Sequence, residues 1–486
     1  MSNKAKKDNS LAISVASGFI WTFGERIIAQ LITATVTMVL ARLLLPEDFG
    51  AISIVMVFIT ICNVFVTNGI GSALVQQKEI EDIDYNTAFL LNIFVSFLVY
   101  LILFICSPYI SSFYKMPILI YVIRVMGLRI PIAALNSVQQ AYIRRRMEFK
   151  KFFFATLIGT LLSGIIGIMM AINGAGIWAI VAQYLINAFI DTCVLSLYIS
   201  WKPRLEFSYE SAKKIFMYGS KLLLAELIAS FESNFRVLLV GHSFGTADLA
   251  FYEEGQKYPS LLTANANAAI NQVMLPVFSK KQDYIEDLKH TLRKAVRLGV
   301  FVLTPVLVGV MVISTSFVMV VLTPKWLPCV PYIRIFCIYY LTRPLEAMCG
   351  EAIKAIGKTG WMLKKMIIVN GFALFFLIVS VFVIKNTLFL ATTMIVDMII
   401  SVMTNSYYSI KYLKYTSYEQ LQDFFGSMIP AVIMGGVVFL ISLLIGNGIF
   451  GLVMQIVTGV ITYVVIAYFF FRDMYNSILD LVKRKG

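Results

Sequence analysis

The sequence predicts an all-α polytopic membrane protein with about 14 transmembrane helices. Of its 486 residues, 59% are hydrophobic and only 14% are charged, whereas soluble domains carry about 25% charged residues. The mean hydropathy is +0.82, and apolar runs long enough to cross a hydrocarbon core of about 30 Å recur along the whole chain. These observations exclude soluble enzymes and nucleic-acid-binding proteins, so we expect no nucleic-acid partner.

Proline, glycine and charged residues divide the chain into fourteen predicted spans. Before the first span, Lys4, Lys6 and Lys7 precede an apolar stretch, as they would in a signal peptide. Glu25 and Arg26 interrupt that stretch and no small-residue cleavage site follows, so we predict a retained first span. The fourteen spans start near residues 14, 49, 86, 117, 152, 176, 215, 249, 296, 328, 366, 388, 427 and 449.

Basic residues fall mainly on one side of the predicted membrane. The connectors on the side of the N-terminus hold most of the 41 Lys and Arg residues, and the opposite connectors hold only Arg42, Lys115, Lys325 and Lys385. Cytoplasmic loops carry the excess of Lys and Arg in membrane proteins. We therefore expect both termini in the cytoplasm, and the net charge of +14 reflects topology.

Cysteine, histidine and catalytic motifs offer little material for enzyme chemistry. Six cysteines lie in or beside apolar runs without CxxC spacing, and His242 and His290 are far apart in sequence. No Walker A sequence occurs, which argues against ATP-driven transport by this chain alone. We expect no metal site, no cofactor and no enzymatic activity.

Two turns between spans repeat at an offset of 200 residues. Leu40–Gly50 reads LARLLLPEDFG and Val240–Ala250 reads VGHSFGTADLA, so Asp48 and Asp248 occupy matching positions. Spans one and two therefore recur as spans seven and eight. Two lobes of the same orientation follow, related by an axis along the membrane normal.

A second repeat pairs span four with span ten. LRIPIAAL contains Arg129 and Pro131, and LTRPLEAM contains Arg343 and Pro344. The prolines predict that both helices break near mid-depth. The predicted domains are an N-terminal lobe of spans one to six at 1–200, a C-terminal lobe of spans seven to twelve at 201–414, and spans thirteen and fourteen with a cytoplasmic tail at 415–486.

Small and polar residues recur at steps of three and four in spans two and eight. Such a stripe either packs helices closely in lipid or forms a polar wall of a wet cleft. Asn267, Asn271 and Gln272 offer more donors and acceptors than close packing needs, and sugar hydroxyls would suit them. The stripes comprise Thr60, Asn63, Thr67 and Gly71 in span two, and Ser260, Thr263, Asn267 and Asn271 in span eight.

Eight basic residues lie inside the predicted spans, where an unpaired charge is costly. Acids one turn away could neutralise three of them, in the pairs Glu232 with Arg236, Glu253 or Glu254 with Lys257, and Glu346 with Arg343. Lys221 is expected to snorkel to the cytoplasmic face. The remaining four are Arg26, Arg124, Arg129 and Arg334.

Arginines without a local acid need a partner from elsewhere. A guanidinium binds phosphate bidentately and keeps its charge, so arginines lining a cleft predict an anionic substrate such as a diphosphate. The alternative is a salt bridge with Glu25, Asp191 or Asp397. The candidate substrate-binding residues are Arg129, Arg343, Arg124, Arg334, Arg26, Asn63, Thr67, Asn267 and Asn271.

Asp191 in span six and Asp397 in span twelve occupy corresponding places in the two predicted lobes. A buried carboxylate can carry a proton or bind a cation, which couples many transporters to an ion gradient. Both residues are therefore candidates for ion coupling. Pairing with one of the arginines is the alternative.

Four segments resemble one known family. They read SGFIWTFGERIIAQ, LARLLLPEDFGAISI, GIGSALVQQ and AYIRRRMEF. The chain resembles the polysaccharide transporter family, the Wzx-type flippases of the multidrug/oligosaccharidyl-lipid/polysaccharide flippase (MOP) superfamily, close to colanic acid and teichuronic acid exporters. The likeness covers essentially the whole chain and is most specific at the LARLLxPxDFG turn. It implies a V-shaped, MATE-like fold of two six-helix lobes plus two C-terminal helices.

The resemblance also implies an activity, which is the flipping of undecaprenyl-diphosphate-linked oligosaccharide across the bacterial cytoplasmic membrane. Implied partners are that lipid-linked substrate, membrane lipid, and a polysaccharide polymerase with glycosyltransferases, and the chain would function as a monomer. The alternatives are a MATE-like ion-coupled multidrug antiporter and a non-transporting scaffold of a polysaccharide synthase complex. Family members share no single set of cavity residues, so the candidate arginines depend on physical grounds alone.

Overall fold

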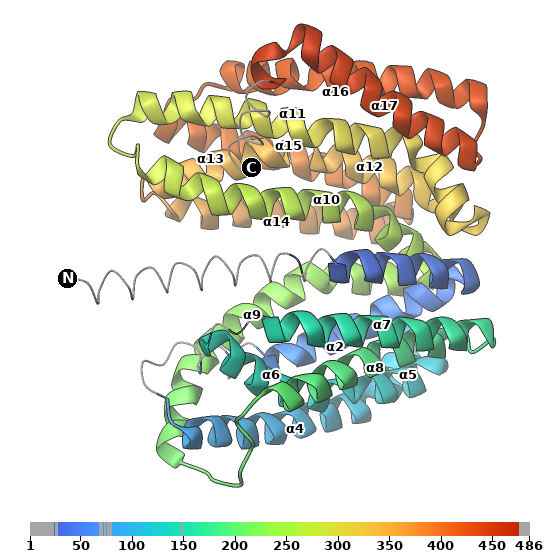
Figure 1. Ribbon diagram of the computed structural model, residues 1–486, viewed down its shortest axis with the longest axis vertical. Helices are drawn as coiled ribbons and strands as arrows, with labels where there is room; N and C mark the ends of the chain where they lie inside the picture. Colours follow the sequence, from blue (N-terminus) through green and yellow to red (C-terminus); the bar gives the residue numbers. More distant parts are fainter. Residues whose placement is uncertain are drawn as a thin grey trace. The chain divides into compact units, whose positions relative to one another are not determined.

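The computed structural model describes residues 24, 28–67, 71, 74, 80–146, 148 and 150–475, and within them every regular element is a helix (Figure 1). Ten of these helices are long and apolar enough to cross a membrane. The chain is therefore a multi-pass membrane protein. The ten are Pro46–Thr67, Asp82–Tyr114, Ile118–Arg146, Lys150–Ile172, Ile177–Tyr198, Ile285–Leu322, Gly360–Ile384, Thr387–Leu413, Ser417–Ile445 and Ile449–Phe470.

These ten helices coincide with ten of the fourteen predicted spans. Spans one, seven, eight and ten correspond instead to the described helix Ile28–Leu43, to α9 (Tyr209–Phe244), to α10 (Thr246–Ser279) and to the broken pair α12 (Val330–Tyr340) and α13 (Arg343–Ala355). Charged and polar residues lower the hydropathy of α9 and α10, for example Glu253, Glu254 and Lys257 in α10. The total of fourteen remains a prediction.

The chain divides into two compact units, residues 1–249 and 250–486. In the first unit α2 packs against α4, α6 and α9, while α7 pairs with α8. The apolar core of this unit includes Leu40, Ile59 and Ile123, none more than 1% exposed. Its helices are Ile28–Leu43, α2 (Pro46–Thr67), α4 (Asp82–Tyr114), α5 (Ile118–Gly127), α6 (Arg129–Arg146), α7 (Lys150–Ile172), α8 (Ile177–Tyr198) and α9 (Tyr209–Phe244).

Helix α9, which the sequence assigns to the second lobe, packs on the first unit. The His242 ring stacks on Phe113 with centroids 4.0 Å apart, and the Tyr114 hydroxyl donates to the Leu238 carbonyl at 3.1 Å. These contacts attach the far end of α9 to α4.

In the second unit α11 is the central helix, packed against α12, α13, α16 and α17. The core here includes Phe278, Leu292 and Trp361. The helices are α10 (Thr246–Ser279), α11 (Ile285–Phe317) with η1 (Val318–Leu322), η2 (Pro324–Cys329), α12 (Val330–Tyr340), α13 (Arg343–Ala355), α14 (Gly360–Ile378) with η3 (Val379–Ile384), α15 (Thr387–Leu413), α16 (Ser417–Ile445) and α17 (Ile449–Phe470).

The predicted breaks in spans four and ten are confirmed. Leu128 separates α5 from α6, and Leu341 with Thr342 separates α12 from α13. Pro131 and Pro344 lie in the first turn of the second helix, where backbone N–H groups have no intrahelical acceptor. Each break therefore places an arginine at the start of the second helix.

The repeated turns are also confirmed. α2 begins at Pro46 and α10 begins at Thr246, an offset that matches the two similar sequences. The two turns lie against each other, because a Cβ added at Gly50 would be 1.9 Å from the Thr246 carbonyl oxygen. Glycine at position 50 therefore permits the close approach of two backbones.

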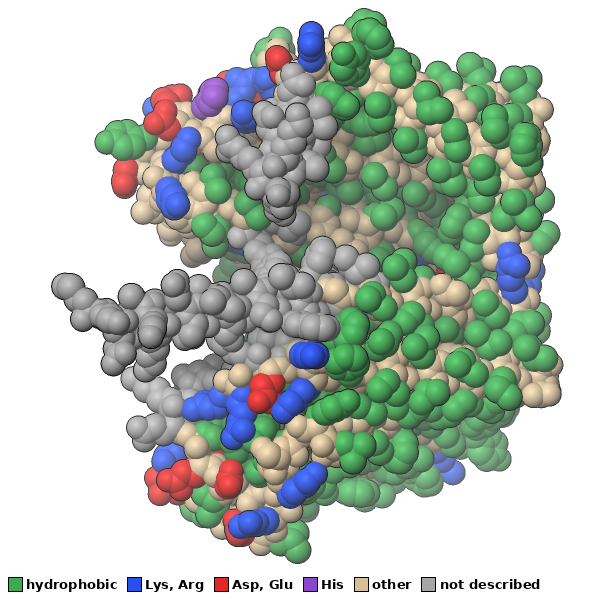
Figure 2. All heavy atoms as spheres, viewed as in Figure 1, with side chains coloured by type: hydrophobic (Ala, Val, Ile, Leu, Met, Phe, Trp, Pro, Cys, Tyr) green, Lys and Arg blue, Asp and Glu red, His purple; other side chains and the backbone are tan. Residues whose placement is uncertain are grey.

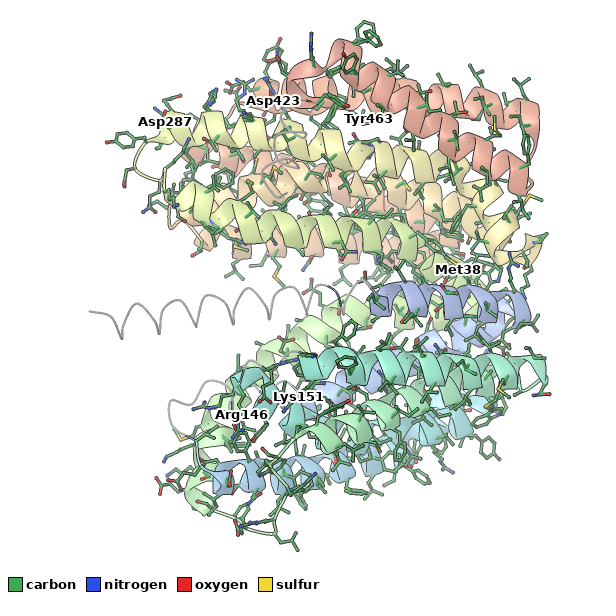
Figure 3. The ribbon with its side chains drawn as sticks, viewed as in Figure 1. Met38, Arg146, Lys151, Asp287, Asp423 and Tyr463 are labelled. Carbon is green, nitrogen blue, oxygen red and sulfur yellow. The ribbon has the colours of Figure 1, made fainter. Side chains whose placement is uncertain are left out.

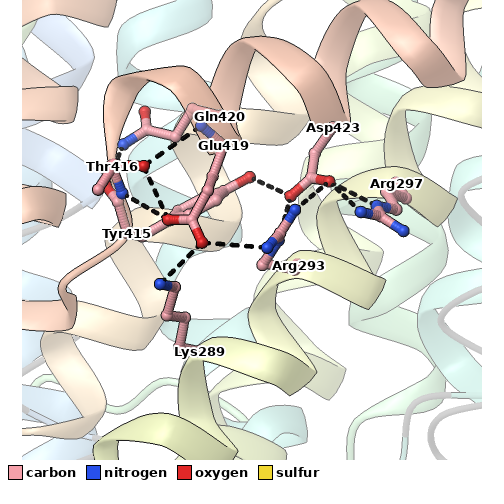
Figure 4. Close-up of polar contacts among 8 residues, drawn as sticks. All are labelled: Lys289, Arg293, Arg297, Tyr415, Thr416, Glu419, Gln420 and Asp423. Atoms are coloured by element: carbon pink, nitrogen blue, oxygen red, sulfur yellow. Dashed lines mark hydrogen bonds and ion pairs between the residues drawn. The ribbon is translucent and has the colours of Figure 1, made fainter.

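A buried ionic cluster fixes α16 to α11 (Figures 3 and 4). The Asp423 carboxylate is fully buried and accepts from Arg293 Nε at 2.7 Å, Arg293 Nη2 at 3.1 Å and Arg297 Nε at 2.5 Å. The Tyr415 hydroxyl donates to the same carboxylate at 2.9 Å. Glu419, one turn earlier on α16, pairs with Lys289 at 2.8 Å.

Charged side chains are unevenly distributed in each unit. In the face that Figure 2 shows, most Lys, Arg, Asp and Glu side chains gather at one end of the helices, and hydrophobic side chains cover most of the remaining surface. This distribution is the one expected of helices that pass through a hydrocarbon layer.

Candidate functional site

The first unit contains a polar cavity of about 260 Å³, which we call the 129 cavity. It lies among α2, α6 and α8, and stripe residues of α2 form one wall. Its polar and charged lining consists of Asn63, Thr67, Arg129, Asn136, Ser137, Gln140, Arg144, Asn187, Asp191 and Thr192.

In this cavity the Arg129 guanidinium contacts a thioether sulfur and an aromatic ring. Its Nη1 lies 3.6 Å from the Met56 sulfur, and its guanidinium carbon lies 5.4 Å from the Tyr184 ring centroid. Across the described ranges, no carboxylate lies within ion-pair distance of Arg129. A thioether and an aromatic face do not neutralise the positive charge, so the guanidinium can bind an anion.

In the same cavity a ladder of amides joins α6 to α8. Arg144 donates to Gln140 at 3.1 Å, Gln140 donates to Asn136 at 2.5 Å, and Asn136 donates to Asp191 at 2.9 Å. Asn136 also reaches Thr192 at 3.2 Å. These bonds fix the amide orientations and make Asp191 the acceptor at one end of a network that begins at the Arg144 guanidinium.

The second unit contains a corresponding polar cavity of about 430 Å³, which we call the 343 cavity. It is formed by α10, α12, α13, α14 and α15. Its polar and charged lining consists of Asn267, Asn271, Tyr339, Arg343, Glu346, Glu351, Lys354, Trp361, Lys365, Asn370, Asp397 and Ser401.

Arg343 contacts aromatic residues in this cavity. It donates to the Tyr339 hydroxyl, and its guanidinium carbon lies 4.9 Å and 6.0 Å from the Tyr339 and Tyr340 ring centroids. The expected ion pair with Glu346 does not form. Glu346 instead pairs with Lys365 of α14 at 2.7 Å, because the turn of α13 directs it toward α14 and α15.

The other charges of the 343 cavity are paired locally. Lys354 bonds to Glu351 at 2.6 Å, and Glu346 also accepts from Ser401. Asp397 is 4% exposed. Both lining lysines are therefore paired with a carboxylate. Among the described lining residues, Arg343 is the cation that has no carboxylate at ion-pair distance.

Two asparagines provide free acceptors in the cavities. Asn63 Oδ1 in the 129 cavity and Asn267 Oδ1 in the 343 cavity are buried and, in the described structure, accept no hydrogen bond. Buried amide oxygens ordinarily have a partner. A hydroxyl-rich ligand could supply one in each cavity.

The structure therefore brings together the residues that the sequence paired. Each cavity holds the arginine of its broken span, one aspartate and at least two stripe residues, which are Arg129, Asp191, Asn63, Thr67 and Gly71 in the first unit and Arg343, Asp397, Asn267 and Asn271 in the second. The stripes line the cavities only in part, because Thr60, Ser260 and Thr263 lie outside both linings.

Arg124 and Arg334 lie outside both cavities. Arg124 Nε donates to Ser107 Oγ at 3.0 Å, and Arg334 Nε donates to Ser314 Oγ at 3.2 Å. Each guanidinium thus links the first half of a broken span to the preceding helix. Arg26 lies outside the described residues.

Predictions for other charged and polar residues of the spans can be compared with the structure only in part. The pairing of Lys257 with Glu254 is confirmed at 3.1 Å. The side chains of Lys221 and Gln272 lie outside the described part of the structure.

Sequence reasoning missed the amide ladder and Lys365. The polar run NSVQQ at 136–140, inside an otherwise apolar span, was the available signal for the ladder. Lys365 stands at the start of α14 in a basic connector, where nothing local distinguishes a cavity residue from a loop residue.

Comparison with known proteins supports the sequence resemblance. Residues 39–331 match the family described as "Polysaccharide biosynthesis protein". The chain belongs to this family. It is 21% identical over 351 residues to the teichuronic acid biosynthesis protein TuaB of Bacillus subtilis (strain 168), covering 72% of this chain and 73% of TuaB. It is 24% identical over 352 residues to the lipopolysaccharide biosynthesis protein WzxC of Escherichia coli (strain K12), covering 71% of each chain.

Solved structures show the same fold. The lipid II flippase MurJ in an inward closed conformation superposes with a TM-score of 0.74 at 15% identity, covering 94% of this chain and all of MurJ. An inward-facing MATE family multidrug transporter of the MOP superfamily superposes with a TM-score of 0.60 at 15% identity, covering 82% of this chain and 99% of the transporter. The predicted MOP-like helical fold is thereby confirmed.

Proposed function

We propose that this chain is a flippase that moves undecaprenyl-diphosphate-linked oligosaccharide across the bacterial cytoplasmic membrane for surface polysaccharide synthesis. One observation carries the proposal. Each unit has a polar cavity in which an arginine without a carboxylate partner lies among amide and hydroxyl groups. A lipid-linked oligosaccharide combines a diphosphate with many hydroxyls, and these are the groups that such cavities can bind.

Each part of the substrate has a proposed site. Arg129 and Arg343 bind diphosphate oxygens, and Asn63, Thr67, Asn267 and Asn271 bind sugar hydroxyls. The prenyl chain remains in lipid. Arg124 and Arg334 hold helices together through Ser107 and Ser314, so they are assigned no substrate contact.

The family and its members support this function. One relative is named a succinoglycan biosynthesis transport protein, ExoT of Rhizobium meliloti (strain 1021), and is 23% identical over 288 residues, covering 59% of this chain and 58% of ExoT. MurJ, which shares the fold, is named a lipid II flippase. A transporter without enzymatic activity fits both names.

The wider arrangement belongs to the same proposal. We place fourteen spans in two six-helix lobes, 1–200 and 201–414, with an appended segment 415–486 and both termini in the cytoplasm. Alternating access moves the substrate, Asp191 and Asp397 couple transport to an ion, and the chain acts as a monomer beside a polymerase and glycosyltransferases.

A multidrug antiporter is the main competing function. Small cationic drugs favour a cavity dominated by carboxylates, whereas Glu346 and Glu351 are both paired with lysine and each cavity also holds an arginine that has no carboxylate at ion-pair distance among the described residues. A non-transporting scaffold gives no reason for two similar polar cavities.

Transport by purified protein tests the function directly. Proteoliposomes would carry a fluorescent undecaprenyl-diphosphate oligosaccharide, and its loss to an external quencher would report flipping. We expect Arg129→Ala and Arg343→Ala each to slow flipping at least ten-fold, because charge-assisted hydrogen bonds contribute about 1.5–3 kcal/mol each. Arg→Lys should recover only part of the rate, since an ammonium lacks the guanidinium fork.

Arg124→Ala is the matched control, because it removes an arginine from the same broken span but outside the cavity. It should flip substrate at the wild-type rate when equal amounts are reconstituted. Normal flipping by both cavity variants would disprove the assignment of the arginines. A wild-type protein that flips no lipid-linked oligosaccharide would disprove the function itself.

A further inference from the structure

A further pocket, lined largely by basic residues, lies in the 250–486 unit and shares no lining residue with either polar cavity. It has a volume of about 510 Å³ and lies between the N-terminal end of α11 and the residues that follow α17. Its lining is His290, Arg293, Lys294, Arg297, Leu298, Asp473 and Met474. The proposed transport mechanism makes no use of this pocket.

The basic residues form one face of α11. His290, Arg293, Lys294 and Arg297 follow the spacing i, i+3, i+4 and i+7, so their side chains share one side of the helix. Like charges at this spacing repel each other. Two acids beside the stripe reduce this repulsion, namely Asp423 and, in the pocket lining, Asp473.

On one side the anion is Asp423 (Figure 4). It accepts from Arg293 and Arg297 and holds both guanidiniums in a fixed orientation. Arg297 uses Nε and Nη2 in this pair and leaves Nη1 free. Lys294 and His290 are exposed and have no hydrogen-bond or ion-pair partner among the described residues.

At this pocket the sequences of α11 and of the segment that ends α17 change from apolar to charged residues. After Arg297, α11 continues through Leu298–Phe317 without a charged residue, and α17 ends at Phe470 just before Arg472. The Tyr463 hydroxyl donates to the Phe301 carbonyl at 2.5 Å, which aligns the two helices. A boundary shared by two aligned helices marks the level of lipid headgroups.

An apolar path leads from the pocket toward the hydrocarbon. Leu298 lines the pocket, and Val302 and Val306 follow at successive steps of four on α11. Their exposed fractions are 54% and 42%. An acyl chain could lie along this row while its phosphate stays beside Lys294.

We propose that this pocket binds the phosphate headgroup of an anionic membrane phospholipid. Lys294, His290 and the free Nη1 of Arg297 bind the phosphate, and Leu298, Val302 and Val306 contact an acyl chain. This site goes beyond the proposed transport function, and binding there does not depend on a substrate in either polar cavity.

Lipid binding to the purified full-length protein tests the proposal. In neutral detergent, titration with phosphatidylglycerol or with phosphatidylcholine of the same acyl chains would be followed by native mass spectrometry. Wild-type protein should prefer phosphatidylglycerol. One basic residue near a membrane surface contributes about 1 kcal/mol, so Lys294→Gln should weaken phosphatidylglycerol binding about five-fold and Lys294→Glu about thirty-fold.

Lys280→Gln is the matched control, because Lys280 is an exposed lysine at the same end of the unit and lies outside the pocket. It should change phosphatidylglycerol binding less than two-fold. Equal effects of Lys280→Gln and Lys294→Gln would show general charge attraction and overturn the site. If glycerol 3-phosphate displaced the lipid as well as phosphatidylglycerol itself, the pocket would be a free-phosphate site and the lipid assignment would be wrong.

Discussion

Asp423 is the residue on which the attachment of α16 depends most. Its carboxylate is fully buried, yet it accepts hydrogen bonds from Arg293, Arg297 and Tyr415. Removing one member of a buried ion pair is costly because the other charge is left without compensation. The two arginines keep some access to solvent, with side chains 25% and 43% exposed, which reduces that cost.

We expect Asp423→Asn to lower the free energy of unfolding by about 2–3 kcal/mol, since asparagine keeps the shape but loses the charge. The thermal unfolding midpoint in detergent, followed by size-exclusion chromatography of a fluorescent fusion, would measure the loss. Glu210→Gln is the control, because the Glu210–Lys214 pair is largely exposed and such pairs contribute little. Equal midpoints for Asp423→Asn and wild type would show that the cluster does not hold α16.

At the scale of helices, the contact between the two repeated turns depends on a missing side chain. A Cβ at Gly50 would lie 1.9 Å from a backbone oxygen of Thr246, and backbone cannot move aside as a flexible side chain can. Gly50→Ala should therefore destabilise the protein by about 1–3 kcal/mol. Gly371→Ala, in open space on α14, should be neutral or slightly stabilising in the same thermal assay. Equal stability of the two variants would contradict the close contact.

The face that each stripe helix turns toward its cavity can also be tested. Thr67 on α2 and Asn271 on α10 line polar cavities, whereas Val64 and Thr263 are buried in helix contacts at 5% and 2% exposed. In an active cysteine-free background, Thr67→Cys and Asn271→Cys should react with a small hydrophilic thiol reagent at least ten times faster than Val64→Cys and Thr263→Cys. Similar rates at all four positions would mean that the stripes are only packing surfaces.

At the scale of the whole molecule, the distribution of charge predicts its orientation. Lys115 at the end of α4 and Arg146 at the end of α6 are exposed and lie on opposite sides of the predicted membrane. In intact cells, a membrane-impermeant thiol reagent should label Lys115→Cys and spare Arg146→Cys unless the cells are opened. The reverse pattern would invert the predicted topology and place both termini outside.

The sequence by itself determined the class of protein, ten of the spans, both broken helices and the matched turns. These features depend on local properties, namely the length of an apolar run, the position of a proline and the residues of a turn. Residues such as Pro131 and Pro344 therefore have the same effect whatever surrounds them. The correspondence between Arg129 and Arg343 was also predictable, because the two residues occupy matching positions in a sequence repeat.

Only the tertiary structure decided which charged residues share a cavity. Arg124 and Arg129 are five residues apart, yet one bonds to Ser107 on a neighbouring helix and the other lines the 129 cavity. Likewise Glu346 of α13 pairs with Lys365 of α14 and not with Arg343 on its own helix. The physical reason is that helix rotation and packing set where a side chain points, and both depend on contacts between residues far apart in the chain.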